Sequence, residues 1–251
     1  MKKKISISII TYNEEKIIAK CLEKLRWADE ILVIDSGSTD DTVAICESFG
    51  AKVIQHVFEN FGAQKQFALD QTANDWVLSL DADEVLSDEL IDEIKNLNLD
   101  NEYKGYYIPR THVFLNTIFT YGSEHKKPIL RFFNKKYGKF TPNKVHETIV
   151  VDGKLGYLKN EMLHYTVFDF DIAIQKQIKY ALLSGELFYE KNKKSSLLKI
   201  LFKFPFDFIK VYFLQRNFLN GYQGFTWSMF SAFSSYLKYA YLKELHHNKS
   251  L

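Results

Sequence analysis

Two aspartates, Asp81 and Asp83, stand one residue apart directly after the apolar run Trp76–Leu80. An apolar run of this length is typical of a strand that is buried on both faces of a sheet. Residues i and i+2 of an extended segment point to the same side, so both carboxylates can face one point. Such oxygen donors suit Mg²⁺ or Mn²⁺, which complete their coordination with substrate phosphates. The alternative interpretation is a strand followed by an acidic loop and a helix capped by Ser87.

Two further polar clusters follow predicted strands in the N-terminal third of the chain. Thr11–Glu14 follows the apolar segment Ile5–Ile10, and Asp35–Ser38 follows Ile31–Ile34. Ligands of parallel α/β sheets bind beyond the carboxyl ends of the strands. The first strand is not followed by G-x-G-x-x-G, and the sequence contains no Walker A motif. We therefore expect nucleotide binding through carboxylates and a metal rather than through a glycine-rich loop.

The segments between these clusters have helical periodicity, and strand–helix alternation with short connections predicts a mostly parallel sheet covered by helices. Helices are expected at Glu14–Leu25, Thr42–Phe49, Gly62–Thr72 and Asp88–Leu97, and further strands at Lys52–His56 and Gly105–Arg110. Gly50 is expected to end the second helix. Residues 111–128 are expected to be irregular, and Ile129–Phe133 and Gly156–Leu158 to be edge-like strands. The chain is expected to be helical from Asp171 onward.

The composition indicates a folded chain of 251 residues, with 46% hydrophobic and 25% charged residues. This length allows one large domain or a domain with an appendage. The two cysteines, Cys21 and Cys46, show neither metal-ligand spacing nor a disulfide framework, which fits a reducing compartment. Met1–Lys4 resembles the start of a signal peptide, but Ile5–Ile10 is short and has no cleavage site after it. We expect a mature, cytoplasmic N-terminus.

The C-terminal part of the chain is basic and aromatic. Residues 191–251 contain 10 Lys/Arg, 2 Asp/Glu and 15 of the 39 aromatic residues, whereas residues 1–190 have a net charge of −6. This combination suggests contact with the anionic and apolar surface of a membrane. Nucleic acid is a less favoured partner, because Leu, Ile and Phe dominate here and RNP-like patterns are absent.

The apolar segment Leu197–Val211 contains interspersed lysines and predicts an interfacial helix that is broken at Pro205. Asn217–Leu237 has 21 residues without formal charge, but its polar content favours lying on a membrane over crossing it. A helical layer packed on the sheet domain, or a dimer interface, is the alternative. The predicted division is a sheet domain at residues 1–168 and a helical extension at 169–251.

The three polar clusters, in this order and spacing, resemble family 2 glycosyltransferases of the GT-A fold. Gly62–Leu69, Val145–Glu147 and Gly221–Phe225 resemble the branch of that family that adds glucose or related sugars to the lipopolysaccharide inner core. The resemblance implies an α/β GT-A domain, a UDP-sugar donor and Mg²⁺ or Mn²⁺ as cofactor. It also implies a lipid-linked saccharide acceptor, such as heptose on lipid A, at the cytoplasmic face of the inner membrane.

The resemblance also implies roles for individual residues. The nucleotide-sugar contacts would be Thr11, Tyr12 and Glu14 with uracil and ribose, Asp35 with the base N–H, Lys65 with the diphosphate and Asp81 with the ribose or the metal. Asp83 would hold the metal. A carboxylate at a strand end can accept from a base imide or a ribose hydroxyl, which supports the role of Asp35. The alternatives are a helix cap for Asp35 and an exposed helix lysine for Lys65.

Sugar transfer requires a base for the acceptor hydroxyl, and the resemblance implies inversion without a covalent intermediate. Glu147 is the candidate base, because a segment other than the metal motif should approach the sugar from the face opposite the diphosphate. Glu84 is the competing candidate. His146 and His164 are possible partners of the diphosphate or metal, or structural hydrogen-bonding groups. Arg131 could pair with a phosphate or with a structural carboxylate.

Three other functions are alternatives to transfer to the lipopolysaccharide core. Transfer to polyprenyl phosphate is disfavoured, because the short tail lacks strong spanning helices. A nucleotidyltransferase would need a glycine-rich loop with basic residues near the first strand, and none is present. A membrane-bound scaffold that binds nucleotide sugars without turnover is the non-enzymatic alternative.

Overall fold

The computed structural model describes residues 3–99, 102–141, 148–167 and 170–248. The chain forms two compact units, Met1–Thr111 with Lys126–Tyr165 and His112–His125 with Thr166–Leu251. The boundary expected at residues 168 and 169 stays a prediction. The structure groups the segment His112–His125 with the C-terminal helices.

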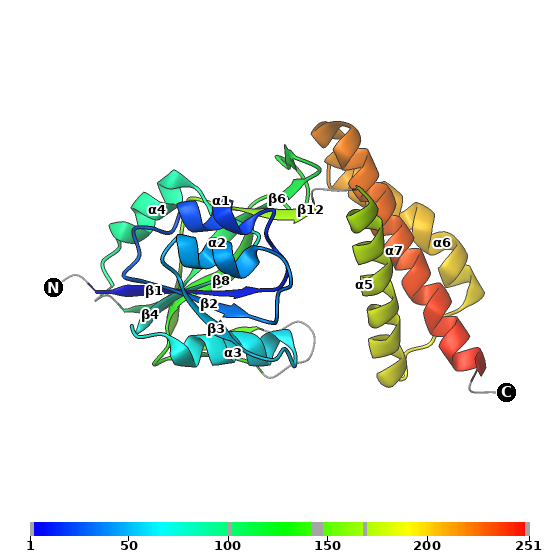
Figure 1. Cartoon of the computed structure of the whole chain (residues 1–251). Coiled ribbons are helices and arrows are strands. Elements are labelled where there is room, and N and C mark those ends of the chain that lie inside the picture. The colour runs from blue at the N-terminus through cyan, green and yellow to red at the C-terminus, as the bar shows by residue number, and fades with distance from the viewer. Residues whose placement is uncertain (1–2, 100–101, 142–147, 168–169, 249–251) are drawn as a thin grey trace. The chain divides into compact units, whose positions relative to one another are not determined.

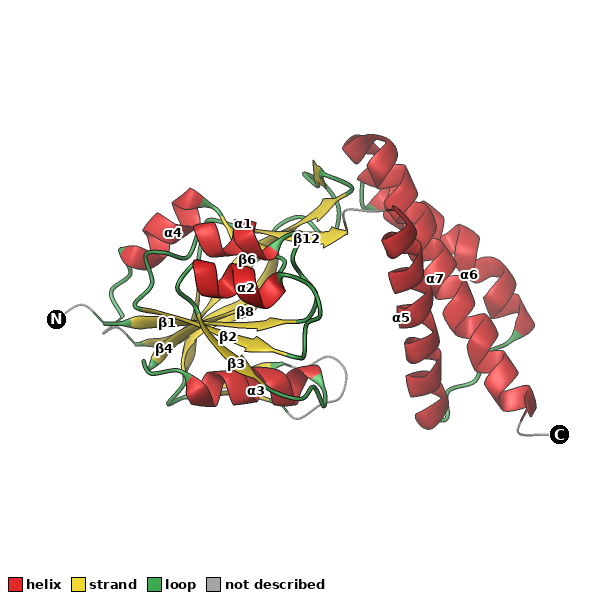
Figure 2. Ribbon diagram, in the orientation of Figure 1, coloured by secondary structure: helices red, strands yellow, loops and turns green. Residues whose placement is uncertain are grey.

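The first unit is built on a twisted sheet whose strands have the order β3-β2-β1-β4-β8-β6-β12-β5 (Figures 1 and 2). Its parallel half consists of β1 (Ile5–Thr11), β2 (Glu30–Asp35), β3 (Lys52–Gln55) and β4 (Trp76–Asp81). The helices of this unit are α1 (Ile18–Glu23), α2 (Thr42–Ser48), α3 (Phe61–Gln71) and α4 (Asp88–Lys95). Figure 1 shows α1 and α2 on one face of the sheet and α3 on the other. The α/β architecture is the one expected, and the strands of this half are parallel.

The helix boundaries follow local chemistry. Ser87 caps α4 by accepting from the N–H of Leu90 at 3.1 Å, as expected. Gly50 follows α2 with a φ of +79°, a conformation that glycine adopts without steric cost. The first helix begins at Ile18 rather than Glu14, because the preceding residues form a turn in which the Glu14 carbonyl accepts from Ile17 and Ile18.

The other half of the sheet is antiparallel. β8 (Lys127–Asn134) lies between β4 and β6 (Tyr103–Phe114), and β12 (Met162–Val167) pairs with β5 (Glu84–Leu86). The prediction that Ile129–Phe133 forms an edge-like strand is wrong. β8 is paired on both sides, by β4 and by β6, and Arg131, Phe132 and Phe133 are buried in succession.

The prediction that residues 111–128 are irregular is also wrong in part. β6 continues to Phe114 and forms a hairpin with β7 (Thr117–Ile118), and β8 begins at Lys127. The remaining strands are β9 (Gly138–Phe140), β10 (Ile149–Val151) and β11 (Lys154–Tyr157). β9 pairs with β10, and β11 pairs in parallel with β6.

The second unit consists mainly of α5 (Phe170–Glu190), α6 (Leu197–Ile209) and α7 (Gly221–Asn248). A π-helical turn, η1 (Lys210–Leu214), and a 3₁₀ turn, η2 (Asn217–Asn220), connect the last two helices. The expected break at Pro205 is wrong, because α6 continues through it to Ile209. Proline removes one backbone donor, but the helix is stabilised by its packing along α7. None of the described helices has both the length and the apolarity needed to cross a membrane.

Candidate active site

The carboxyl ends of β1, β2 and β4 meet at one edge of the sheet. In the strand register, Ile10 pairs with Asp81, and Thr11 pairs with Asp35. All of β1 is buried, as expected for a strand inside a parallel sheet. The three polar clusters predicted from sequence are therefore brought together at this edge.

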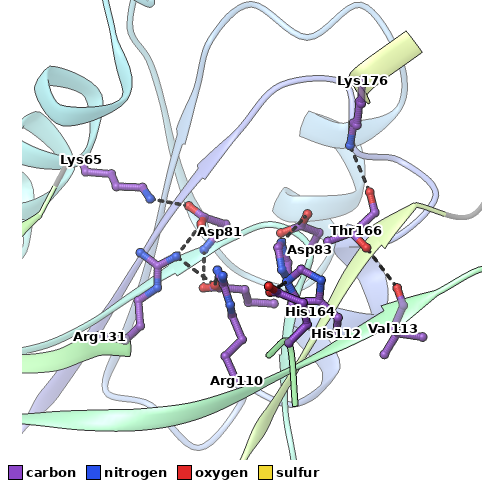
Figure 3. Close-up of polar contacts among 12 residues, drawn as sticks. Lys65, Asp81, Asp83, Arg110, His112, Val113, Arg131, His164, Thr166 and Lys176 are labelled. Atoms are coloured by element: carbon purple, nitrogen blue, oxygen red, sulfur yellow. Dashed lines mark hydrogen bonds and ion pairs between the residues drawn. The ribbon is translucent and has the colours of Figure 1, made fainter. Parts of the chain in front are cut away.

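Asp81 lies between two cations (Figure 3). Lys65 Nζ is 2.8 Å from Asp81 Oδ1, and Arg131 Nη2 is 2.5 Å from Asp81 Oδ2. Burial alone would raise the pKa of Asp81, but the charges of Arg131 and Lys65 outweigh it and hold the pKa well below its usual range. Lys65 is buried, which excludes the interpretation of an exposed helix lysine. Its ammonium is fixed at the end of β4 by the position of α3.

Glu84 holds the turn that follows β4. Its carboxylate accepts the N–H of Asp81 at 3.1 Å and lies 2.8 Å from Arg131 Nη2 and 3.3 Å from Arg110 Nη1. The residue is fully buried. A carboxylate in this position is engaged in structural ion pairs, which argues against Glu84 as the base for an acceptor hydroxyl. Arg131 therefore pairs with carboxylates, the second of the two possibilities that its sequence context left open.

Asp83 contacts His164, which lies near the end of the first unit in sequence. Its Oδ2 lies 3.2 Å from His164 Nε2, and its Oδ1 is buried without a hydrogen-bond partner in the described part of the chain. The pairing of β5 with β12 sets His164 opposite Glu84, and the Tyr165 N–H donates to the Asp83 carbonyl at 2.9 Å. Strand pairing thus brings together two groups that sequence analysis considered as metal partners.

The residues at this edge fit a divalent cation that is shared with a substrate. Among the described residues, no group of three or more His, Cys, Asp or Glu side chains is placed to enclose a metal. Asp83 and His164 provide two donors, one of which is the unpartnered Asp83 Oδ1. Mg²⁺ and Mn²⁺ sites of this kind take few protein ligands and leave positions for phosphate oxygens and water.

The predicted nucleotide contacts differ in their environments. Thr11 is buried, and its Oγ1 has no hydrogen-bond partner among the residues described, whereas Tyr12 is exposed. The N–H of Glu14 donates to Thr42 Oγ1 at 2.8 Å. This bond ties the loop after β1 to the start of α2. The roles of these residues with uracil and ribose stay predictions.

Asp35 organises the turn after β2. Its Oδ2 accepts from the N–H groups of Gly37 and Ser38 at 2.9 Å, and its Oδ1 accepts from Ser38 Oγ at 2.5 Å. The residue is fully buried, and Gly37 has a φ of +90°, which favours glycine. Asp35 is therefore neither exposed nor a cap of α2. Its predicted contact with a base N–H stays a prediction.

His146 and the candidate base Glu147 lie outside the described residues. Arg110 is the functional-site residue that the sequence analysis missed. It was recognised only as the end of a strand, because nothing in the local sequence shows that this strand runs near Glu84.

The fold and the site define an α/β protein of the GT-A-like class, with an Asp-x-Asp pair at the carboxyl end of its fourth strand. The sequence profile described as Glycosyl transferase family 2 matches residues 6–154. The chain therefore belongs to glycosyltransferase family 2.

Several curated relatives match nearly the whole chain. A glycosyltransferase of Rickettsia typhi is 33% identical over 97% of this chain and 88% of the relative. The lipopolysaccharide core biosynthesis glycosyltransferase LpsC of Rhizobium meliloti is 31% identical over 96% of this chain and 93% of the relative. Among solved structures, that of S. aureus TarS is similar with a TM-score of 0.49 and 18% identity, over 72% of this chain and 39% of that one.

Proposed function

We propose that this family 2 glycosyltransferase moves a hexose, with glucose from UDP-glucose as the first candidate, to a lipopolysaccharide core sugar such as heptose. The observation that carries the donor half of this proposal is the pair of Asp83 and His164, with Asp83 two residues after Asp81, which contacts the buried Lys65. The likeness to LpsC over almost the full length of both chains supports the acceptor half.

Asp83 and His164 would hold Mg²⁺ or Mn²⁺, with Asp81 contacting the metal or the ribose. When bound there, the metal would neutralise the negative charge that develops on the leaving diphosphate. Lys65 carries a positive charge at the same edge of the sheet and would add to that stabilisation. Arg131 and Glu84 keep Asp81 in place, because each contacts Asp81 directly and both are buried.

The transfer is a single in-line displacement with inversion. The bond between the acceptor oxygen and C1 of the sugar forms while the bond between C1 and the diphosphate oxygen breaks, and UDP leaves. Glu147 takes the proton of the acceptor hydroxyl, since a neutral hydroxyl is a poor nucleophile. The acceptor is part of a lipid, so the reaction takes place at the cytoplasmic face of the inner membrane.

A thermal-shift screen of nucleotide sugars tests the donor half. UDP-glucose with Mn²⁺ should raise the melting temperature, and the same mixture should release UDP slowly without acceptor. Truncated lipopolysaccharide should accelerate UDP release and gain a hexose by mass spectrometry. If no nucleotide sugar shifts the melting temperature with or without metal, the proposed donor chemistry is wrong.

A further inference from the structure

Helix α6 exposes many of its apolar side chains, whereas its ion pair lies on the side that packs on α7. Lys203 and Asp207 form an ion pair of 2.9 Å, and Lys203 Nζ lies over the Tyr239 ring of α7 at 5.9 Å from the ring centroid. Asp207 is only 8% exposed, and Ile200, two turns earlier on the same side, is buried as well. A helix that packs on a protein in water normally has polar side chains on its exposed side, opposite the apolar stripe that faces the core.

The outward face of α6 and η1 forms a continuous apolar ridge. Its members are between 52% and 75% exposed and are Leu198, Leu201, Phe202, Phe206, Ile209, Phe213 and Leu214. On α6 they recur at three- and four-residue spacing, which places them on one side of the helix. Contiguous exposed apolar surfaces of this kind mark sites of contact with a membrane or another macromolecule.

Positive charges flank the ridge on both sides in sequence. The exposed cations are Lys191, Lys193, Lys194, Lys199, Lys210 and Arg216. Between residues 191 and 220, Asp207 is the one acidic residue of the sequence, and it is paired inside the unit with Lys203. An apolar face flanked by cations that few acidic residues offset complements acyl chains beneath anionic headgroups. A second copy of the same ridge would bring these cations against one another, which disfavours self-association as its use.

We propose that the ridge docks on a membrane that contains anionic lipids, with its side chains at the boundary between headgroups and acyl chains and its cations at the phosphates. The inference rests on the proposed function only for the expectation that the acceptor lies in a membrane. It adds the docking element, α6 with η1, and the lipid charge that this element requires.

The test uses the full chain with single cysteines labelled by an environment-sensitive fluorophore. Cys21 and Cys46 are buried and should stay unlabelled in the folded protein. Leu201→Cys and Phe206→Cys place the probe on the ridge, and Tyr180→Cys places it on α5 at a residue that is 55% exposed. Phosphatidylglycerol-containing vesicles should shift the fluorescence emission of the ridge probes to shorter wavelength. The emission of the α5 probe should stay unchanged. Equal shifts at all three positions, or no shift at the ridge, would overturn the proposal.

Two variants separate the apolar and the charged contributions. Phe202→Ser with Phe206→Ser should abolish co-sedimentation with phosphatidylglycerol vesicles, while Lys194→Gln with Lys210→Gln should weaken it and reduce its dependence on salt. Tyr180→Ser is the matched control and should bind like the unchanged protein. Binding to phosphatidylcholine vesicles alone at equal strength would contradict the anionic requirement.

The proposed catalytic function is measured separately from membrane binding, by UDP release. The ridge variants should retain slow UDP release from UDP-glucose in the absence of vesicles, so loss of docking with this activity intact supports the ridge. A protein that dimerises without lipid, loses dimerisation in the Phe202→Ser and Phe206→Ser variant and ignores vesicles would assign the ridge to self-association instead.

Discussion

The guanidinium of Arg131 lies 2.5 Å from the carboxylate of Asp81, and the same nitrogen is 2.8 Å from Glu84. Arg131 comes from β8, which pairs antiparallel with β4. Arg131 lies fifty residues after Asp81 in sequence, and its positive charge offsets the carboxylates of the turn that carries the proposed donor site. The guanidinium is buried and contacts both carboxylates, so its main role is to hold them in place.

We expect Arg131→Met to destabilise the first unit by roughly 3 kcal/mol, because removal of one partner leaves the buried charge of Glu84 with Arg110 alone. The midpoint of urea unfolding should fall with little change in its slope. Lys154→Met removes an exposed ion pair with Glu102 and serves as the control, which should not move the midpoint. An unchanged midpoint for Arg131→Met would show that this network contributes nothing to stability.

The low pKa of Asp81 predicts a specific dependence of stability on pH. The folded-state pKa lies below the ordinary value of 3.8, so the unfolded chain binds the proton more readily. The stabilisation is present above that value and is lost as the pH falls through the folded-state pKa. Asp81→Asn should therefore be less stable at neutral pH, and its difference from the unchanged protein should shrink below about pH 3.8. Urea unfolding at a series of pH values measures this difference, and a constant difference would contradict the assignment.

The parallel half of the fold could be predicted from sequence because its signals are local. The strand Trp76–Asp81 is an apolar run between polar ends, and Ser87 and Gly50 mark helix boundaries through their own side chain or backbone. The antiparallel half depends on pairing between distant segments. The sequence around Glu84 does not show that residues 84–86 pair with β12, and this pairing is what sets His164 beside Asp83.

The position of Lys65 illustrates the same limit within the site. Its neighbours in sequence form a helix with little amphipathic pattern, so an exposed lysine and a buried one were equally consistent with the sequence. The choice is made by the packing of α3 against β1 and β2, which directs the side chain to Asp81. Pro205 failed as a helix breaker for a related reason, since tertiary packing along α7 stabilises α6 beyond its local propensity.

We expect His164→Gln to weaken the effect of Mn²⁺ on donor binding. The substitution removes one of two proposed metal donors, and changes near metal sites typically lower metal affinity by about tenfold or more. The Mn²⁺ concentration that gives half of the thermal shift with UDP-glucose should rise accordingly, and Asp83→Ala should abolish the Mn²⁺-dependent shift. His246→Gln, in α7, is the control. If His164→Gln needs the same Mn²⁺ concentration for half of the thermal shift as the unchanged protein, His164 is not a metal ligand.

Glu147→Gln should retain donor binding and lose transfer. An amide is nearly isosteric with the carboxylate but cannot take the acceptor proton, so the thermal shift with UDP-glucose and Mn²⁺ should persist while the acceptor-stimulated rate falls by roughly 10²-fold or more. The comparison with Glu84→Gln is informative, because that variant should lower the urea midpoint instead. Full transfer by Glu147→Gln would remove it as the base.

Asn220 ties the hairpin of the second unit to the helices. Its Oδ1 accepts from the N–H of Thr120 at 3.0 Å and of Tyr121 at 3.3 Å, and its Nδ2 donates to the Tyr121 carbonyl at 3.0 Å. Asn220→Ala leaves these backbone groups without partners at a buried residue, which should cost about 2 kcal/mol.

The expected readout of Asn220→Ala is faster proteolytic cleavage within residues 112–125, because the hairpin depends on this side chain for its bonds to η2. Thr226→Ala deletes one exposed side-chain bond, to the Tyr222 carbonyl, in the same unit and should leave cleavage unchanged. Equal cleavage rates in both variants would mean that packing of Phe114 and Phe119 on Trp227, rather than Asn220, holds the hairpin in place.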